Sequence, residues 1–198
     1  MKRISITAGM FITAVLLFTQ CTDEKKDDNS IVPTVSEFGG YGSQVKWGEH
    51  IVLSGGCGDC HTPKKMTDQG PVDDSSLLLS GHPAQMPIPL VDRLDFQAKG
   101  VFATQTLTAW VGPWGVSFSA NLTSDSTGIG PWKEDQFIYA IRHGVTKGIA
   151  GSRPILPPMP WHSIKNFSDD ELKAIFGYLK TVKAIKNAVP APMPPASK

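Results

Sequence analysis

Apolar side chains recur every three or four positions in three stretches of the chain, and this spacing predicts three helices. The pattern is clearest over 168–185, where Ser168 and Glu171 form a capping box ahead of an apolar stripe. A second helix is predicted over 133–143, with two acidic residues in its first turn. A short third helix is predicted over 44–54 and ends at a pair of glycines. The predicted fold is therefore mainly α, with about three core helices.

Polar and apolar residues alternate on both sides of a Gly-Pro-Trp-Gly sequence, which is typical of a small β-hairpin. The alternation covers 101–110 and 116–122, and the turn lies at 112–115. No long helix is predicted between His61 and Trp132, a region rich in proline and glycine. We therefore expect long ordered loops around this hairpin, which is marginally stable alone and needs a surface to pack against.

The first residues have the composition of an export signal. Lys2 and Arg3 precede an apolar run over 4–18, which is short for a membrane-spanning helix. Cys21 follows this run and is itself followed by polar residues, a pattern that resembles a bacterial lipoprotein signal. We therefore expect residues 1–20 to be removed and Cys21 to carry a lipid that anchors the chain on the periplasmic side of a membrane. A plain cleaved signal with an incidental cysteine is the alternative.

The 198 residues are enough for one domain around a single core. We place that domain at 44–185, with a flexible tether over 21–43 and a proline-rich extended tail over 186–198. Hydrophobic residues make up 40% of the chain, which is sufficient for a buried core. The formal net charge of +1 is too small for a nucleic-acid footprint, so we expect no nucleic-acid partner.

Cys57, Cys60 and His61 form a Cys-x-x-Cys-His motif, for which three kinds of chemistry compete. A structural zinc site needs four ligands, usually from two paired clusters, and the sequence has no second cysteine pair. A thioredoxin-like redox pair follows a strand, whereas a predicted helix precedes this motif. Attachment of a haem c uses all three residues, because the two sulfurs form thioethers and the imidazole binds the iron. We therefore predict one covalently bound haem c, which suits an exported chain.

A second axial ligand is expected on the opposite side of the iron, where a methionine raises the reduction potential. Met66 is too near His61 in the sequence to reach the other face easily, and Met193 lies in the proline-rich tail. Met86 and Met159 remain, and we choose Met159 because the prolines around it stiffen its loop. Three histidines are rival ligands, although each is more simply a surface or hydrogen-bonding residue: His82, His143 and His162.

Beyond this motif, the sequence resembles one haem unit of the cytochrome c subunits of membrane-bound alcohol and gluconate dehydrogenases. Those subunits typically carry three such units, whereas this chain has one Cys-x-x-Cys-His. The resemblance covers roughly 44–184 in order. It is carried by these segments: Gly48–Val52, Cys60–Pro63, Asn121–Asp125, Gly128–Trp132, Phe137, Ala140–Gly144, Pro158–Pro160, Asp169–Ile175 and Tyr178–Leu179.

The resemblance implies a cytochrome c fold, in which the helices predicted over 44–54 and 168–185 cross. We expect the small Gly48 to allow their close approach near Tyr178. The resemblance also makes Met159 the sixth ligand of the iron. It puts three further residues near the haem: Trp132, Arg142 and Trp161.

We expect a one-electron carrier rather than an enzyme, in which the iron alternates between ferric and ferrous states. Its partners would be a redox protein donor and acceptor, including a membrane dehydrogenase or a terminal oxidase. The alternatives are a haem enzyme or a gas or redox sensor with an open distal position, and a binding module without haem. The carbonyl that orients His61 is left open among those of Pro63, Pro71 and Pro113.

Overall fold

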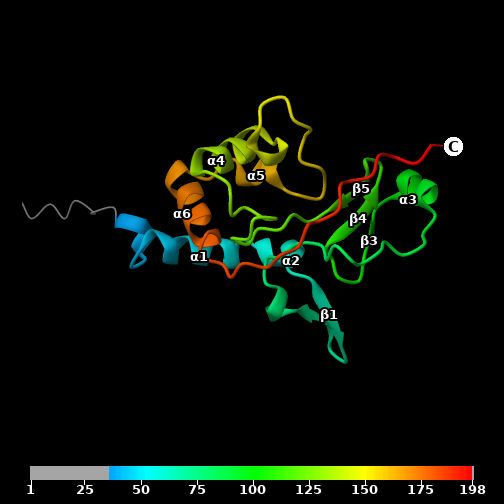
Figure 1. The fold of residues 1–198 in the computed structure, drawn as a ribbon, viewed down its shortest axis with the longest axis horizontal. Coiled ribbons are helices and arrows are strands. Elements are labelled where there is room, and N and C mark those ends of the chain that lie inside the picture. Colours follow the sequence, from blue (N-terminus) through cyan, green and yellow to red (C-terminus); the bar gives the residue numbers. More distant parts are fainter. Residues whose placement is uncertain (1–35, 198) are drawn as a thin grey trace, which may run out of the picture. The chain divides into compact units, whose positions relative to one another are not determined.

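The structure, a computed structural model, describes residues 36–197 (Figure 1). The predicted signal segment 1–20, Cys21 and the first part of the predicted tether lie outside the described residues. The described residues belong to one compact unit. Within this part of the chain, no helix combines the length and the apolar character that crossing a bilayer requires.

Helices form most of one end of the unit, and the three predicted from periodicity are confirmed as α1, α4 and α6. Helix α4 stops at Gly144, whose φ of +62° is the left-handed conformation of a helix cap. The described residues contain six α-helices: α1 (Gln44–Ser54), α2 (Cys57–His61), α3 (Arg93–Lys99), α4 (Glu134–His143), α5 (Trp161–Ile164) and α6 (Asp169–Leu179). Three short 3-10 helices accompany them: η1 (Glu37–Gly40), η2 (Ser75–Leu77) and η3 (Thr146–Gly148).

Helix α6 begins as predicted but ends several residues early. Ser168 and Glu171 form the expected capping box, in which each side chain accepts a hydrogen bond from the other residue's amide. The helix ends at Leu179 rather than near Ile185. The backbone beyond it bonds to a different segment, since the amide of Ile185 donates to the hydroxyl of Thr123 (3.2 Å). The segment after the helix is therefore held by a partner distant in sequence, although its apolar periodicity favours a longer helix.

Helices α1 and α6 cross at Gly48, as predicted, but the contact lies one turn from the expected partner. A Cβ atom on Gly48 would lie 1.8 Å from the carbonyl oxygen of Ala174, so the two backbones touch there rather than at Tyr178. Helix α4 packs on α6 through the rings of Phe137 and Phe176, whose centroids are 5.4 Å apart. These contacts form one buried apolar core.

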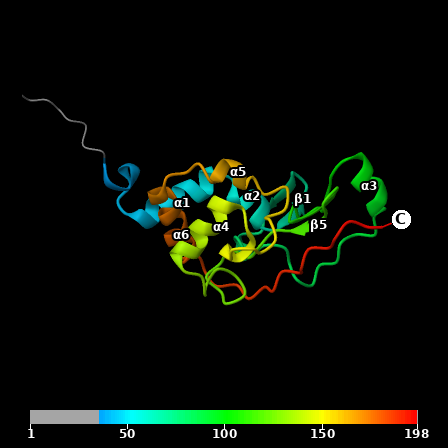
Figure 2. The ribbon, with the colours of Figure 1, turned by 90° about the horizontal axis from the view of Figure 1, so that it is seen from above.

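Two small antiparallel sheets make the fold mixed rather than mainly α. The predicted turn at 112–115 joins β4 (Ala109–Gly112) to β5 (Gly115–Phe118), so the hairpin is confirmed. The predicted first strand over 101–110 is not continuous, because it divides into β3 (Phe102–Ala103) and the start of β4, which pair antiparallel on either side of a turn. A second hairpin was not predicted: it consists of β1 (Lys64–Thr67) and β2 (Gly70–Asp73). Figures 1 and 2 both show the three-stranded sheet at the opposite end of the unit from α1 and α6.

Residues 185–197, here termed the C-terminal strap, run extended from the end of α6 to β5 (red in Figures 1 and 2). Met193 pairs with Val116 of β5 through two backbone hydrogen bonds. Further on, the amide of Ala196 donates to the side chain of Gln97 in α3 (2.8 Å). The segment predicted as a tail is therefore part of the compact unit, because it closes one edge of the sheet.

The last residues of the predicted tether pack against α1. Gly39 of η1 lies on the ring of Trp47, since a Cβ atom there would be 2.8 Å from the indole nitrogen. The ring of Tyr41 stacks on His50, with centroids 4.8 Å apart. Packing therefore begins before residue 44, where the sequence placed the domain boundary.

Candidate functional site

The Cys-x-x-Cys-His motif forms its own short helix, α2. Gly56 precedes it with a φ of +70°, a conformation open to glycine, and so redirects the chain from α1 into α2. Because residues three apart share one face of a helix, the thiols of Cys57 and Cys60 lie on the same side. Both thiols are free and half-buried, and burial raises the pKa of each. A helix precedes the motif, where a thioredoxin-like pair would have a strand.

His61 is held in one orientation by a backbone carbonyl. Its Nδ1 lies 2.8 Å from the carbonyl oxygen of Ala120. A carbonyl can only accept, so Nδ1 carries the proton and the lone pair of the ring is on Nε2. The side chain is buried, which lowers the pKa of the imidazole, whereas the bond to Ala120 opposes that shift. A neutral imidazole with Nε2 available is the form in which histidine binds iron.

The sequence did not identify Ala120 as the partner of His61. The carbonyl belongs to none of Pro63, Pro71 and Pro113 but to a residue 59 positions away in the chain. Every residue has a carbonyl, so no residue type marks this role. Only the tertiary fold brings the segment after β5 against α2.

Three further contacts hold α2 in place. The hydroxyl of Ser119, next to Ala120, donates to the carbonyl of Cys60. The buried ammonium of Lys64 donates to the carbonyls of Gly58 (2.9 Å) and Thr62 (2.7 Å), where a cation also complements the helix dipole. The sequence did not predict Ser119 and Lys64 as parts of the site, because both lie outside the Cys-x-x-Cys-His motif and reach α2 only in the folded chain.

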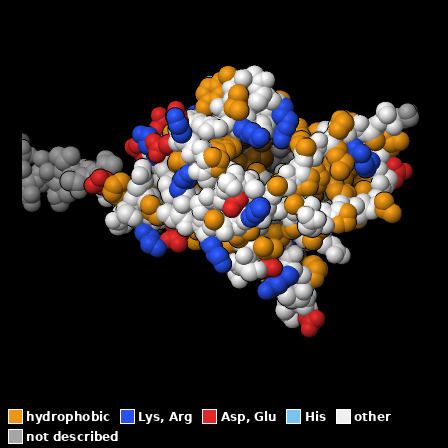
Figure 3. Space-filling model, viewed as in Figure 1, with side chains coloured by type: hydrophobic (Ala, Val, Ile, Leu, Met, Phe, Trp, Pro, Cys, Tyr) orange, Lys and Arg blue, Asp and Glu red, His pale blue; other side chains and the backbone are white. Residues whose placement is uncertain are grey.

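Met159 lies in the loop between α4 and α5 and is half-buried. Met159 and Cys57 both pack against the same apolar core cluster. The loop is fixed at two points. The hydroxyl of Ser117 in β5 donates to the carbonyl of Pro157 (2.6 Å), and the amide of Ile155 donates to the carbonyl of Gly144 (2.7 Å). In the space-filling view the surface is hollowed beneath α5 and this loop, and hydrophobic side chains show inside (Figure 3).

The other sequence candidates for the second axial position have different surroundings. Met66, Met86 and Met193 are exposed. His82 is buried and hydrogen-bonded at both ring nitrogens. The rings of the other two histidines, both exposed, contact aromatic neighbours: His143 stacks on Tyr139 (3.9 Å between centroids), and His162 lies tilted against Trp161 (3.8 Å).

Two tryptophans and an arginine complete the predicted residues. Trp132 is half-buried and packs against the apolar core, at the end of the loop that leads into α4. Trp161 begins α5 and lies on Gly144, where a Cβ atom would approach its ring to 2.4 Å. Arg142 donates to the carbonyl of Lys165 and forms an ion pair with Asp169 at the start of α6. These bonds tie α4 to α5 and α6.

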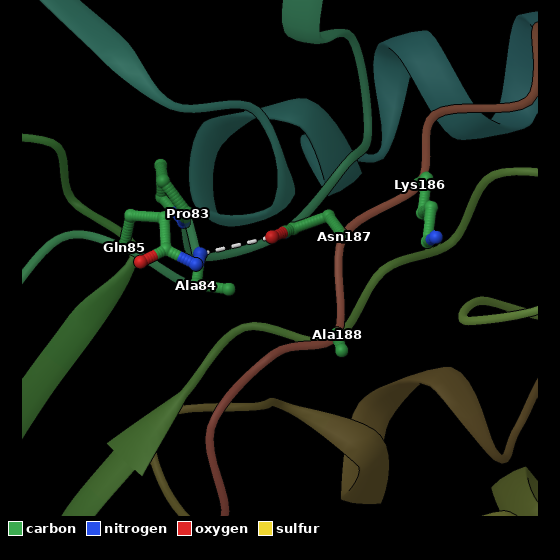
Figure 4. A pocket seen from close by; sticks show the side chains of 6 residues that line it. All are labelled: Pro83, Ala84, Gln85, Lys186, Asn187 and Ala188. Carbon is green, nitrogen blue, oxygen red and sulfur yellow. Dashed lines mark hydrogen bonds between the residues drawn. The ribbon is translucent and has the colours of Figure 1, made fainter.

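A pocket of about 370 Å³ lies where the C-terminal strap meets the residues after His82 (Figure 4). The amide of Ala84 donates to Oδ1 of Asn187 across it (2.9 Å). None of the described site residues predicted from the sequence lines this pocket. Its lining consists of Pro83, Ala84, Gln85, Lys186, Asn187 and Ala188.

Comparison with known proteins supports the resemblance inferred from the sequence. No family model matches the chain. The gluconate 2-dehydrogenase cytochrome c subunit of Pantoea cypripedii is 29% identical over 135 residues, which are 68% of this chain and 22% of that protein. The fructose dehydrogenase cytochrome subunit of Gluconobacter japonicus is 33% identical over 70 residues, 35% of this chain and 14% of that protein. One of the subunits of nicotinate dehydrogenase from Pseudomonas putida is 32% identical over 80 residues, 40% of this chain and 6% of that protein.

The chain thus spans less than a quarter of the length of each of these relatives. It resembles the cytochrome c subunits of dehydrogenases, as the sequence predicted.

Proposed function

We propose that this chain is a one-electron carrier with a single haem c bound through Cys57, Cys60 and His61. The observation that carries the proposal is the arrangement of α2. Two free thiols share one face of the helix, and the next residue is a buried imidazole whose Nδ1 is held by the carbonyl of Ala120. Nε2 of His61 is then left to bind the iron.

The donor set fits the group it would hold. The two half-buried cysteines would form thioether bonds, and the rigid backbone around His61 would keep its ring orientation through changes of oxidation state. When bound, haem c supplies the exchange of one electron between ferric and ferrous iron. The chain would contribute His61 and Met159 as ligands and the apolar core beside Cys57 as the environment of the group.

We assign the sixth ligand position to Met159. It is half-buried in a loop fixed to β5 and to α4, and it packs on the same core cluster as Cys57. Trp132 and Trp161 would line the haem, in keeping with their place in the resemblance. Arg142 is assigned to the haem surroundings on the resemblance alone, since its described bonds are to Lys165 and Asp169.

The fold proposed for this unit is that of a cytochrome c. The crossing of α1 and α6 at Gly48 supports it, as does the packing of α4 on α6. The electron donor and acceptor are proposed to be redox proteins, including a membrane dehydrogenase or a terminal oxidase, because the relatives are named as dehydrogenase subunits. We also propose export to the periplasmic side and lipid anchoring through Cys21, on the sequence of residues 1–28.

The test is to produce the chain with haem maturation machinery and record its absorbance spectrum. Met159→Ala should abolish the spectral signature of ferric His/Met haem and lower the midpoint potential. Met86→Ala is the matched control, because that side chain is exposed and should leave the spectrum unchanged. An unchanged spectrum in Met159→Ala would reject the ligand. High-spin haem in the wild-type protein, with ready binding of carbon monoxide, would instead support an open distal site.

A further inference from the structure

A second buried histidine, His82, lies beside the segments that hold His61. Its side chain is completely buried. The amide of His82 donates to the carbonyl of Ser119 (3.0 Å), the residue before Ala120. The preceding residue, Gly81, donates its amide to the carbonyl of His61 (2.8 Å). His82 is therefore linked to His61 in two ways. It follows Gly81, which bonds to the carbonyl of His61, and it bonds to Ser119, which precedes Ala120.

A chain of hydroxyl groups begins at the imidazole of His82. Its Nε2 lies 3.0 Å from the carbonyl oxygen of Met86, which can only accept, so the neutral ring is protonated at Nε2. Its Nδ1 therefore accepts from the hydroxyl of Thr108 (2.9 Å). The chain continues from Thr108 to Thr106 (2.8 Å) and on to Thr104 (3.1 Å). All three threonines are buried.

The hydrogen bonds between these hydroxyl groups can all point toward the ring or all point away from it, because each hydroxyl donates one hydrogen bond and accepts others. With His82 neutral, every hydroxyl donates toward the ring, and the oxygen of Thr104 accepts from the amide of Ala109 (3.2 Å). With a proton on Nδ1, every hydroxyl donates away from the ring, and Thr104 reaches the carbonyl of Ala109 (3.4 Å). Neither direction leaves a buried polar group without a partner, so the network accommodates both charge states of His82.

The groups that bond to the ring are uncharged. Burial lowers the pKa of His82, and its bond to the carbonyl of Met86 opposes that shift. His82 is therefore neutral at pH 7 and gains its proton in the acidic range. The ring also packs on Phe118, whose centroid is 4.9 Å away. The elements packed around it carry these ionisable groups: Cys57, Asp59, Cys60 and His61 on α2, Lys65, Asp68 and the ion pair of Lys64 with Asp73 on the β1–β2 hairpin, and Lys186 on the C-terminal strap.

We propose that His82 takes up one proton when the site gains one electron, so that electron transfer is coupled to proton uptake under mildly acidic conditions. This inference rests on the proposed function. One electron arrives from a reduced protein donor and lowers the charge of the site by one. One proton from the solvent then binds Nδ1 of His82 and restores that charge. Both leave when the electron passes to the acceptor. A buried charge is weakly screened, so the added electron strengthens proton binding at His82.

The test measures the midpoint potential of the haem-loaded protein from about pH 5 to about pH 8. In the wild-type protein the potential should rise as the pH falls. His82→Gln should remove this rise, because a neutral amide cannot take the proton. His143→Gln is the matched control and should keep the rise, since that ring is exposed on α4. Thr106→Val interrupts the hydroxyl chain and should move the rise to lower pH.

A second readout follows the ring itself. In ¹⁵N NMR spectra, the imidazole of His82 should gain its second proton at higher pH in the ferrous than in the ferric protein. If His82→Gln does not fold, this titration and the Thr106→Val variant test the coupling between the electron and the proton on His82. A wild-type pH dependence retained in His82→Gln, or the same titration of His82 in both oxidation states, would overturn the inference. Absence of covalent haem would instead refute the proposed function, whereas a haem-loaded protein with a pH-independent potential would refute the coupling alone.

Discussion

The crossing of α1 and α6 depends on Gly48 having no side chain. In Gly48→Ala, the new Cβ atom would lie 1.8 Å from the carbonyl oxygen of Ala174 and 2.4 Å from its carbonyl carbon. These are backbone atoms of a buried helix, so the helices must separate by more than an ångström. Overpacking of a core typically costs about 1–3 kcal/mol, and contact with backbone puts this site at the upper end. Alanine regains at most about 1 kcal/mol of helix propensity.

We therefore expect Gly48→Ala to lower the free energy of unfolding by roughly 2 kcal/mol, or the melting temperature by about 4–8 °C. Urea and thermal denaturation measure this change. Gly177→Ala on α6 is the matched control, because its Cβ atom would meet only a methyl group of Val45 at 4.0 Å. It should be neutral or stabilising by up to about 1 kcal/mol. Equal stability of the two variants would refute the close crossing.

Three further predictions concern contacts around α6 and the C-terminal strap. Ser168→Ala removes the N-cap of α6 and should cost about 1 kcal/mol of unfolding free energy in urea denaturation; wild-type stability would contradict the capping box. Asn187→Ala removes side-chain bonds to the backbone of residues 80, 82 and 84 and should speed amide hydrogen exchange over 80–84. Unchanged exchange would show that the C-terminal strap does not stabilise this segment. Arg142 holds the pKa of Asp169 below its usual range, so this ion pair stabilises the fold at neutral pH and is lost as the pH falls through the folded pKa. Asp169→Asn should therefore unfold more easily than wild type at pH 7, and the difference should shrink as the pH falls below about 4 and vanish once the pH is below the folded pKa of Asp169; an undiminished difference in acid would contradict the assignment.

Local patterns in the sequence were sufficient for the elements that contain their own start and stop signals. The capping box at Ser168 and the glycine after His143 mark helices whose apolar faces repeat regularly. The Gly-Pro-Trp-Gly turn predicted the β4–β5 hairpin because Gly115, with a φ of +96°, meets the turn's backbone requirement. In these places local preference and tertiary packing agree.

Elements that lack a clear apolar pattern or depend on distant partners were missed or misplaced. The β1–β2 hairpin has no alternating apolar pattern, since three of the four residues in each strand are exposed. The segment after α6 does not continue as a helix to Ile185 and instead bonds to Thr123, more than 50 residues away in the chain. The same holds for the candidate site: the spacing of Cys57, Cys60 and His61 predicted the motif, whereas the carbonyl of Ala120 became evident only in the fold.

The central claim is that Cys57 and Cys60 bind one haem covalently. The most direct measurement is the mass of the proteolytic peptide that contains both cysteines, after production with haem maturation machinery and extraction with acidic solvent. We predict a single peptide that retains the mass of one haem and has no free thiol. A peptide of unmodified mass, with both thiols open to alkylation, would contradict the claim.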